Sequence, residues 1–312
     1  MTASVLQAEM AAVEVMTGVT VADLPLLLQH RSTPLVLKGL CAHWPLVQAG
    51  LVSDEAVADY LLTFDRGEMV GSCYLPPEAK GRIFYNADYS GFNYQGGQVA
   101  LPLLLRDLLA LKTRPNPPTL YMGSTEINLA FAGLAEHNSF DLAGFSLQDI
   151  AAPVKPLTSV WLGNQSRIAA HFDFPHNLAC NAVGSRTFTL FGPEQISHLY
   201  PGPMEFAPGG QDVSLVDFAN PDFNKFPDFA KAIAAGQRVT LEPGDVLFIP
   251  SMWWHHVEAH QALNVLITHW WRDTSAYFGR PTNALLHAML SLRSLPKAQR
   301  SAWQDIVNHY IF

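Results

Sequence analysis

The feature that most constrains the fold is a series of short apolar segments between residues 157 and 271. Each segment is long enough for a strand and too short for a usual helix, and glycine, proline and asparagine lie between them. Many short strands separated by turn residues are typical of a β-sandwich or a barrel. The segments are residues 157–162, 177–183, 187–191, 237–241, 246–249 and 264–271.

The regions on either side of this series have a different pattern. Strands are expected at residues 34–38 and 119–122, helices at 53–62, 101–111, 282–292 and 296–310, and a long surface loop at 75–99. We therefore predict an α+β protein in three parts. These are an N-terminal mixed helical region at 1–150 that packs on the core, a β core at 151–273, and a C-terminal helical pair at 274–312.

The composition excludes several classes of protein. Hydrophobic residues make up 49% of the chain and charged residues 15%, which excludes a disordered protein. The formal net charge of −8 disfavours general binding to nucleic acid. No apolar run is long enough to span a bilayer, and no basic start of a signal peptide is present. Three scattered cysteines, Cys41, Cys73 and Cys180, form no disulfide framework, so we expect a cytoplasmic location.

One short motif carries potential metal chemistry. His171 and Asp173 are two residues apart, and in a strand such residues point to the same side. A third donor must come from another strand, and the segment 244–256 offers His255 and His256 behind a short strand and a proline. Two imidazoles and one carboxylate on one face of a metal are typical of non-haem Fe(II) oxygenases. Alone, the first pair could also be a surface pair or a core histidine bonded to a carboxylate.

In the order and spacing of its motifs, the region 157–271 resembles the JmjC-type, cupin-like family of oxygenases that depend on Fe(II) and 2-oxoglutarate. The branch it resembles most is that of the asparaginyl hydroxylase acting on hypoxia-inducible factor. The resemblance implies a double-stranded β-helix, or jelly-roll, core. The matching residues are His171-Phe-Asp173, Asn177, Gly184-Ser-Arg-Thr-Phe-Thr-Leu-Phe191, Pro193-Glu-Gln195, Leu199-Tyr-Pro201, Val216-Asp-Phe-Ala-Asn-Pro221, Phe226-Pro227, Gly244-Asp245 and Pro250-Ser-Met-Trp-Trp-His255.

The resemblance implies that His171, Asp173 and His255 are the iron ligands. His255 is preferred to His256 because the family's ligand directly follows the double tryptophan. By strand alternation His256 then faces the other way, where we expect a hydrogen-bonding role in the core. His176 follows the motif closely and is expected in a loop or at the rim of the pocket.

The resemblance also implies residues that bind 2-oxoglutarate as cosubstrate. Arg186 stands where the asparaginyl hydroxylase has a lysine for the distal carboxylate, and its longer, planar guanidinium should reshape the pocket. Asn177, Tyr121 and Thr268 are expected to add hydrogen bonds. Two positions depart from the family, because Ile168 replaces a threonine and Thr268 replaces an asparagine. The alternative for Arg186 is an exposed position on a strand, where it forms a salt bridge. The alternative for Tyr121 is a half-buried strand residue with a structural role only.

These expectations describe a dioxygenase that uses Fe(II), 2-oxoglutarate and O₂ to hydroxylate its prime substrate, or to demethylate it through hydroxylation. By family analogy the substrate is a protein side chain, while a small molecule stays open and nucleic acid is disfavoured by the net charge. One rival is a non-catalytic cupin that binds a metal and acts as a scaffold. Another is a Zn or Mn cupin isomerase or hydrolase, a class that usually carries more histidines and a glutamate.

The C-terminal segment 281–312 is expected to form two helices that make a homodimer. Trp303, Ile306, Val307 and Tyr310 fall on one face at helical spacing. An apolar helix pair must either lie on its own barrel or meet a second copy, and a two-fold contact is the commonest assembly. The resemblance also implies a dimer, because relatives of the asparaginyl hydroxylase dimerise through C-terminal helices.

Overall fold

The structure, a computed structural model, describes residues 10–142, 154–204, 206–210 and 212–312. The described residues of 10–142 and 155–272 form one compact unit, and residues 154 and 273–312 belong to a second. The N-terminal region and the β core therefore share one compact unit.

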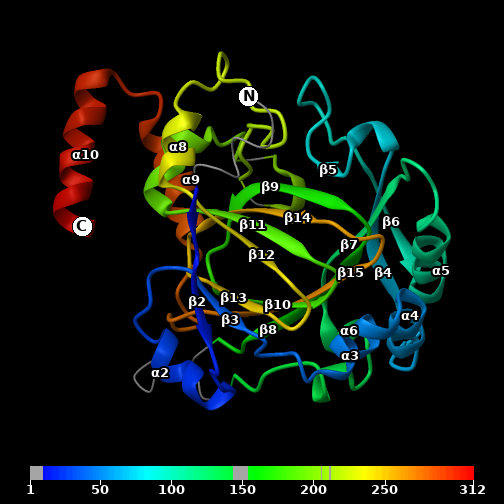
Figure 1. Ribbon diagram of the computed structural model, residues 1–312. Coiled ribbons are helices and arrows are strands. Elements are labelled where there is room, and N and C mark those ends of the chain that lie inside the picture. Colours follow the sequence, from blue (N-terminus) through cyan, green and yellow to red (C-terminus); the bar gives the residue numbers. More distant parts are fainter. Residues whose placement is uncertain (1–9, 143–153, 205, 211) are drawn as a thin grey trace. The chain divides into compact units, whose positions relative to one another are not determined.

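Eight strands of the first unit build a jelly roll. One layer has the strand order β13-β10-β15-β8 and the other β12-β11-β14-β9, and all neighbours within each layer are antiparallel. Figure 1 shows β9, β11 and β14 above β8, β10 and β13. This arrangement confirms the predicted α+β, jelly-roll fold class. The strands are β8 (Leu157–Gly163), β9 (Ser166–Phe172), β10 (His176–Val183), β11 (Arg186–Phe191), β12 (Gln237–Leu241), β13 (Val246–Ile249), β14 (Trp254–Ala259) and β15 (Asn264–Trp271).

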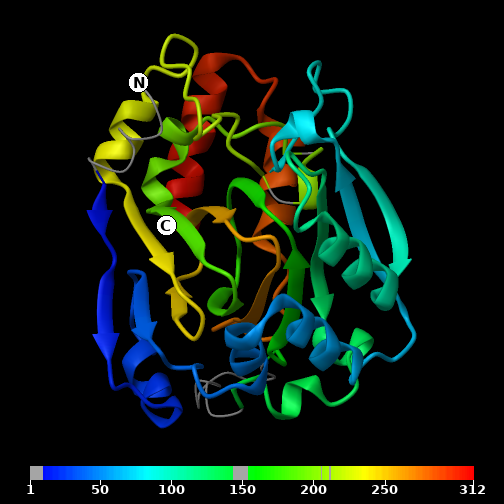
Figure 2. The same ribbon diagram turned by 45° about the vertical axis from the view of Figure 1, so that its right-hand side comes forward.

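Strands from the N-terminal region extend both layers. Within the described residues they complete a nine-stranded sheet and a six-stranded sheet. The nine-stranded sheet gains β2 (Glu14–Thr17) and β3 (Leu35–Lys38) beside β13, and β7 (Thr119–Glu126), β4 (Met69–Leu75) and β6 (Gln95–Ala100) beside β8. The six-stranded sheet gains β1 (Ala11–Ala12) and β5 (Arg82–Ile83) at its two edges. Figure 2 shows β4 and β6, coloured blue-cyan to teal, at one outer side of the sheets.

Helices cover the outer faces of the two sheets. The apolar faces of α3, α4 and α5 bury a core with the nine-stranded sheet, while α7 and α8 do so with Phe191 and Trp254 of the six-stranded sheet. A third cluster, which includes Phe188, Leu190 and Leu247, fills the space between the sheets. The helices are α2 (Leu24–Leu28), α3 (Pro45–Val52), α4 (Asp54–Leu62), α5 (Leu101–Leu111), α6 (Ile127–Ala130), α7 (Ile196–Leu199) and α8 (Phe229–Ala235), with 3-10 turns at Val21–Asp23, Pro77–Ala79, Leu134–Glu136, Pro193–Gln195 and Pro208–Gly210.

The predicted surface loop at residues 75–99 is wrong in part. It contains β5 and most of β6, and Phe84 and Tyr85 are buried. The sequence Gln95-Gly-Gly-Gln98 has little intrinsic preference for a strand. It becomes one because it pairs along its length with β4, an interaction that local sequence does not reveal.

The second unit contains the two predicted C-terminal helices, α9 (Pro281–Leu292) and α10 (Lys297–Ile311). Neither helix has a buried residue. Among the described residues, no helix is both long enough and apolar enough to cross a membrane.

Candidate metal centre

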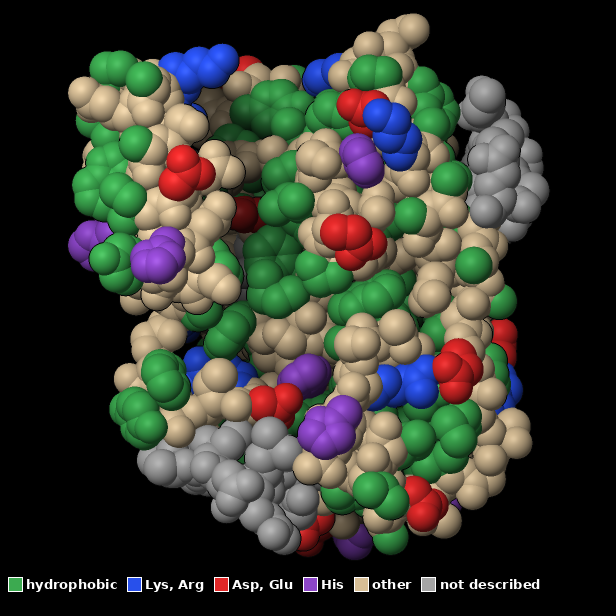
Figure 3. Space-filling view, turned by 90° about the vertical axis from the view of Figure 1, so that its left-hand side faces the viewer, with side chains coloured by type: hydrophobic (Ala, Val, Ile, Leu, Met, Phe, Trp, Pro, Cys, Tyr) green, Lys and Arg blue, Asp and Glu red, His purple; other side chains and the backbone are tan. Residues whose placement is uncertain are grey.

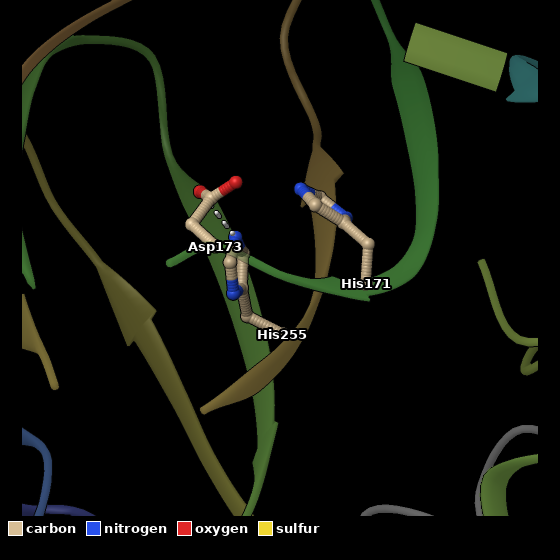
Figure 4. Close-up of side chains that lie close together, drawn as sticks. All are labelled: His171, Asp173 and His255. Carbon is tan, nitrogen blue, oxygen red and sulfur yellow. Dashed lines mark ion pairs between the residues drawn. The ribbon is translucent and has the colours of Figure 1, made fainter. Parts of the chain in front are cut away.

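Three potential metal ligands meet at one end of the jelly roll. His171 lies near the end of β9, Asp173 follows that strand directly, and His255 lies on β14. One donor atom from each side chain falls within 4.8 Å of the others. Figure 4 shows the two imidazoles and the carboxylate pointing toward one another. The structure thus brings together the three side chains that the sequence analysis singled out.

Hydrogen bonds fix the orientation of both imidazoles. Nδ1 of His171 is 2.9 Å from the carbonyl oxygen of Ala169, and Nδ1 of His255 is 3.0 Å from that of Trp253. A carbonyl can only accept, so each Nδ1 donates its N–H and each Nε2 stays free for another partner. Nε2 of His255 lies 3.6 Å from Oδ2 of Asp173. Hydrogen bonds from Nδ1 to a backbone carbonyl, like those of His171 and His255, commonly hold metal-binding histidines in place.

Burial also favours the form of His255 that binds a metal. Desolvation, with a smaller contribution from His171, lowers the pKa of His255 to about 4, although the Asp173 carboxylate opposes this shift. The imidazole is therefore neutral near pH 7, as a ligand must be. Two imidazoles and one carboxylate on one side leave the opposite side open, and this donor set fits Fe(II).

His256 takes no part in this cluster. It is buried on the other face of β14, where its ring lies 4.6 Å from that of Phe218. Burial and the nearby cations Arg167 and Arg238 lower its pKa to about 3. Neither ring nitrogen makes a hydrogen bond of full geometry among the described residues, although the Ile168 backbone opposes the lowering of the His256 pKa. The hydrogen-bonding role expected for His256 stays a prediction. His176, expected in a loop or at a rim, is the first residue of β10.

Three of the residues expected to bind the cosubstrate face the interior of the jelly roll. Asn177, Arg186 and Thr268 are each two residues from a member of the cluster between the sheets, so alternation directs them inward. Those cluster members are Ala179, Phe188 and Leu266. The carbonyl oxygen of the Asn177 side chain is buried and has no hydrogen-bond partner in the described part of the chain.

Arg186 also has a polar atom without a hydrogen-bond partner among the described residues of this interior. Its side chain is buried, its Nε makes no hydrogen bond, and it forms no salt bridge with any described residue. Burial lowers its pKa to about 10, and the Tyr121 hydroxyl opposes that shift. Burial likewise raises the pKa of Tyr121, with Arg186 opposing. The two groups are therefore neighbours, and the alternative of a surface arginine in a salt bridge does not apply.

The two departures from the family pattern also lie inside the jelly roll. Ile168 packs against the apolar cluster between the sheets. The hydroxyl of Thr268 accepts a hydrogen bond of 2.9 Å from Nε1 of Trp161. The local sequence around Trp161 does not reveal that its N–H has an acceptor on β15.

The fold and this group of residues define a cupin-type protein with a His-Asp-His centre. A family model described as "Cupin-like domain" matches residues 27–277, and the chain belongs to that family.

Several named proteins are similar to this chain. "Lysine-specific demethylase JMJ31" of Arabidopsis thaliana is 31% identical over 45% of this chain and 28% of its own length. "Jumonji C domain-containing protein 5" of Drosophila melanogaster is 27% identical over 76% of this chain and 54% of its own length. "HSPB1-associated protein 1" of Homo sapiens is 31% identical over 47% of this chain and 30% of its own length. The matches therefore span between about a quarter and about a half of these relatives.

Proposed function

We propose that the protein is a dioxygenase that uses Fe(II) and 2-oxoglutarate. The observation that carries the proposal is the buried guanidinium of Arg186, which forms no salt bridge with any described residue, in the same interior as the His-Asp-His centre. Burying a cation without an anionic partner is costly, so this interior suits a ligand with a carboxylate. Arg186 pairs with Ala259 on β14, and His255 lies four residues before Ala259 on the same face. A short dicarboxylate fits this arrangement.

Each group has a distinct task in this proposal. His171, Asp173 and His255 hold Fe(II), which supplies the redox chemistry with O₂ when bound. Arg186 pairs with the distal carboxylate of 2-oxoglutarate. Tyr121, Asn177 and Thr268 add hydrogen bonds, and the apolar cluster between the sheets excludes water from the bound acid.

We infer that the prime substrate is a protein side chain. Relatives named as lysine-specific demethylases support this class, and the net charge of −8 disfavours nucleic acid. The reaction is a hydroxylation, or a demethylation that proceeds through hydroxylation. The narrower resemblance to the asparaginyl hydroxylase branch stays a prediction, because the similar proteins carry other names.

We further propose a homodimer built by α9 and α10 in the cytoplasm. Several large apolar side chains of these helices are exposed in the single chain: Leu285, Leu286, Leu290, Trp303, Ile306, Tyr310 and Ile311. Figure 3 shows many hydrophobic side chains, in green, on the face that it draws. All three cysteines are free thiols, which supports a reducing compartment.

Succinate formation tests the proposed activity. Anaerobically purified protein is supplied with Fe(II), 2-oxoglutarate and O₂, and succinate is measured by NMR. We expect slow release without a prime substrate and none from Asp173→Ala. If the wild type binds Fe(II) but neither binds 2-oxoglutarate nor forms succinate, the non-catalytic cupin is the better description. Candidate peptides are then compared by mass for the gain of one oxygen or the loss of a methyl group.

A further inference from the structure

The turn between β13 and β14 is hydrogen-bonded to the segment that follows β9. The backbone N–H of Met252 donates to the carbonyl oxygen of Asp173 over 2.8 Å. The Ser251 hydroxyl donates to the carbonyl oxygen of Phe174 over 2.5 Å. The Ser251 backbone N–H donates to Nδ1 of His176 over 3.1 Å. Three bonds thus join the segment that carries Asp173 to the turn that leads into His255.

The ring of His176 is held by aromatic neighbours. It lies 5.8 Å from Phe248 of β13 and 5.4 Å from Trp271 of β15 between ring centroids, with interplanar angles of 19° and 26°. Phe248 and Trp271 are in turn 5.9 Å apart. Because Nδ1 accepts the Ser251 N–H, it carries no hydrogen of its own. His176 therefore offers the turn an acceptor whose position is fixed by stacking.

The turn needs such support because its backbone is strained. Met252 has a φ of +67°, a left-handed conformation that costs free energy for a residue with a side chain. Without its hydrogen bonds the turn would relax toward commoner conformations. Asp173 and His255 would then lose their present separation, since the Asp173 carbonyl accepts a hydrogen bond from Met252 and His255 lies three residues after Met252.

We propose that His176 is a positioning residue for the metal centre. By accepting the Ser251 N–H it holds the turn 250–253 against Asp173, and so fixes the distance between the carboxylate and His255. The proposal rests on the proposed metal binding by His171, Asp173 and His255. Partners that orient metal ligands without touching the metal typically change metal affinity by about 10- to 100-fold when they are replaced.

Two substitutions separate the hydrogen bond from the stacking. His176→Phe keeps an aromatic ring against Phe248 and Trp271 but has no acceptor. His176→Asn loses the ring but places an amide oxygen near the position of Nδ1. His260→Phe is the matched control, because that histidine contacts Thr187 at the far end of β14. Mn(II) affinity is measured from the free-ion EPR signal, without turnover, and folding from the thermal unfolding midpoint.

We expect His176→Phe to raise the Mn(II) dissociation constant about tenfold with a nearly unchanged unfolding midpoint. His176→Asn should bind Mn(II) within about threefold of wild type even if its midpoint falls, and His260→Phe should bind normally. Unchanged binding by His176→Phe, or equal losses in both His176 variants, would overturn the positioning role. A wild type that does not bind Mn(II) would instead overturn the proposed metal centre.

Discussion

His171 and His255 are directly paired residues on the neighbouring antiparallel strands β9 and β14, and their ring centroids lie 4.3 Å apart. Paired residues point to the same side of a sheet, so this pairing, whose register shifts between His255 and Val257, brings the two imidazoles together. A slip of one residue would replace His255 by His256, whose ring packs on Phe218 on the opposite face. The metal centre is thus a consequence of sheet pairing.

The first prediction concerns the three ligands. Asp173→Ala and His255→Ala should each abolish Fe(II) or Mn(II) binding and turnover, because three ligands leave no redundancy. The fold should persist, since it depends on the apolar clusters of the sheets. Metal titration and circular dichroism measure both effects, with His256→Ala as the control. If His256→Ala abolishes binding while His255→Ala does not, the assigned register is wrong.

The second prediction concerns Arg186. Arg186→Ala should weaken 2-oxoglutarate binding at least tenfold and leave metal affinity nearly unchanged, because a desolvated charge-assisted pair contributes roughly 1.5–3 kcal/mol. Arg186→Lys keeps the charge and should lose less. Arg238→Ala is the control, since Arg238 forms a salt bridge with Glu258. Calorimetry on the Mn(II)-loaded protein gives both affinities. Equal affinity for 2-oxoglutarate in Arg186→Ala would remove this residue from the cosubstrate site.

Local sequence patterns were sufficient for the features that depend on neighbours along the chain. The apolar segments at 237–241, 246–249 and 264–271 are strands with those same bounds. Alternation placed His171 and Asp173 together because they lie two residues apart, and it separated His255 from His256. These relationships need no knowledge of distant contacts.

Other features depend on residues far apart in the sequence and could not be predicted. The strand β6 forms because it pairs with β4, although its glycines disfavour it. Arg186 forms no salt bridge with any described residue, because it is buried inside the jelly roll. The hydrogen bond from Ser251 to His176 joins residues 75 positions apart. Pattern and spacing carry no information on any of these.

The third prediction uses the packing around Tyr121. A methyl group added at Gly163 would lie 2.7 Å from the carbonyl oxygen of Leu120 and 3.1 Å from a ring carbon of Tyr121. Gly163→Ala should therefore cost about 1–3 kcal/mol of unfolding free energy and displace Tyr121, weakening 2-oxoglutarate binding. Gly71→Ala is the control, because open space surrounds that position. Thermal unfolding midpoints that do not distinguish the two variants would contradict this account.

The fourth prediction concerns acid stability. Burial lowers the pKa of His269 from its ordinary value of 6.5 to about 4. The unfolded chain therefore gains a proton below about pH 6.5 that the folded chain does not, so stability is lost as the pH falls through this range. His269→Gln keeps an acceptor for the N–H of Phe140 but does not titrate.

Urea unfolding of the metal-free protein at pH 7 and pH 5 measures this contribution. Between these pH values, the free energy of unfolding of the wild type should fall by about 2 kcal/mol more than that of His269→Gln. The reason is that only the unfolded wild type takes up this proton, over about 1.5 of these pH units. His255 and His256 also have lowered pKa values, so the variant should keep part of the pH dependence. Identical losses in both proteins would show that His269 is protonated in the folded state.

The last prediction concerns assembly. Trp303 and Ile306 of α10 are 44% and 41% exposed in the single chain, and Tyr310 is 80% exposed, so this helix presents an apolar face with no partner from the described residues of its own unit. A two-fold contact with a second copy would bury that face. Light scattering at micromolar concentration should give a dimer for the wild type and a monomer for Trp303→Glu. Gln304→Glu adds the same charge beside it and should stay dimeric. A monomeric wild type would exclude the dimer, and a dimer that survives Trp303→Glu would place the interface elsewhere.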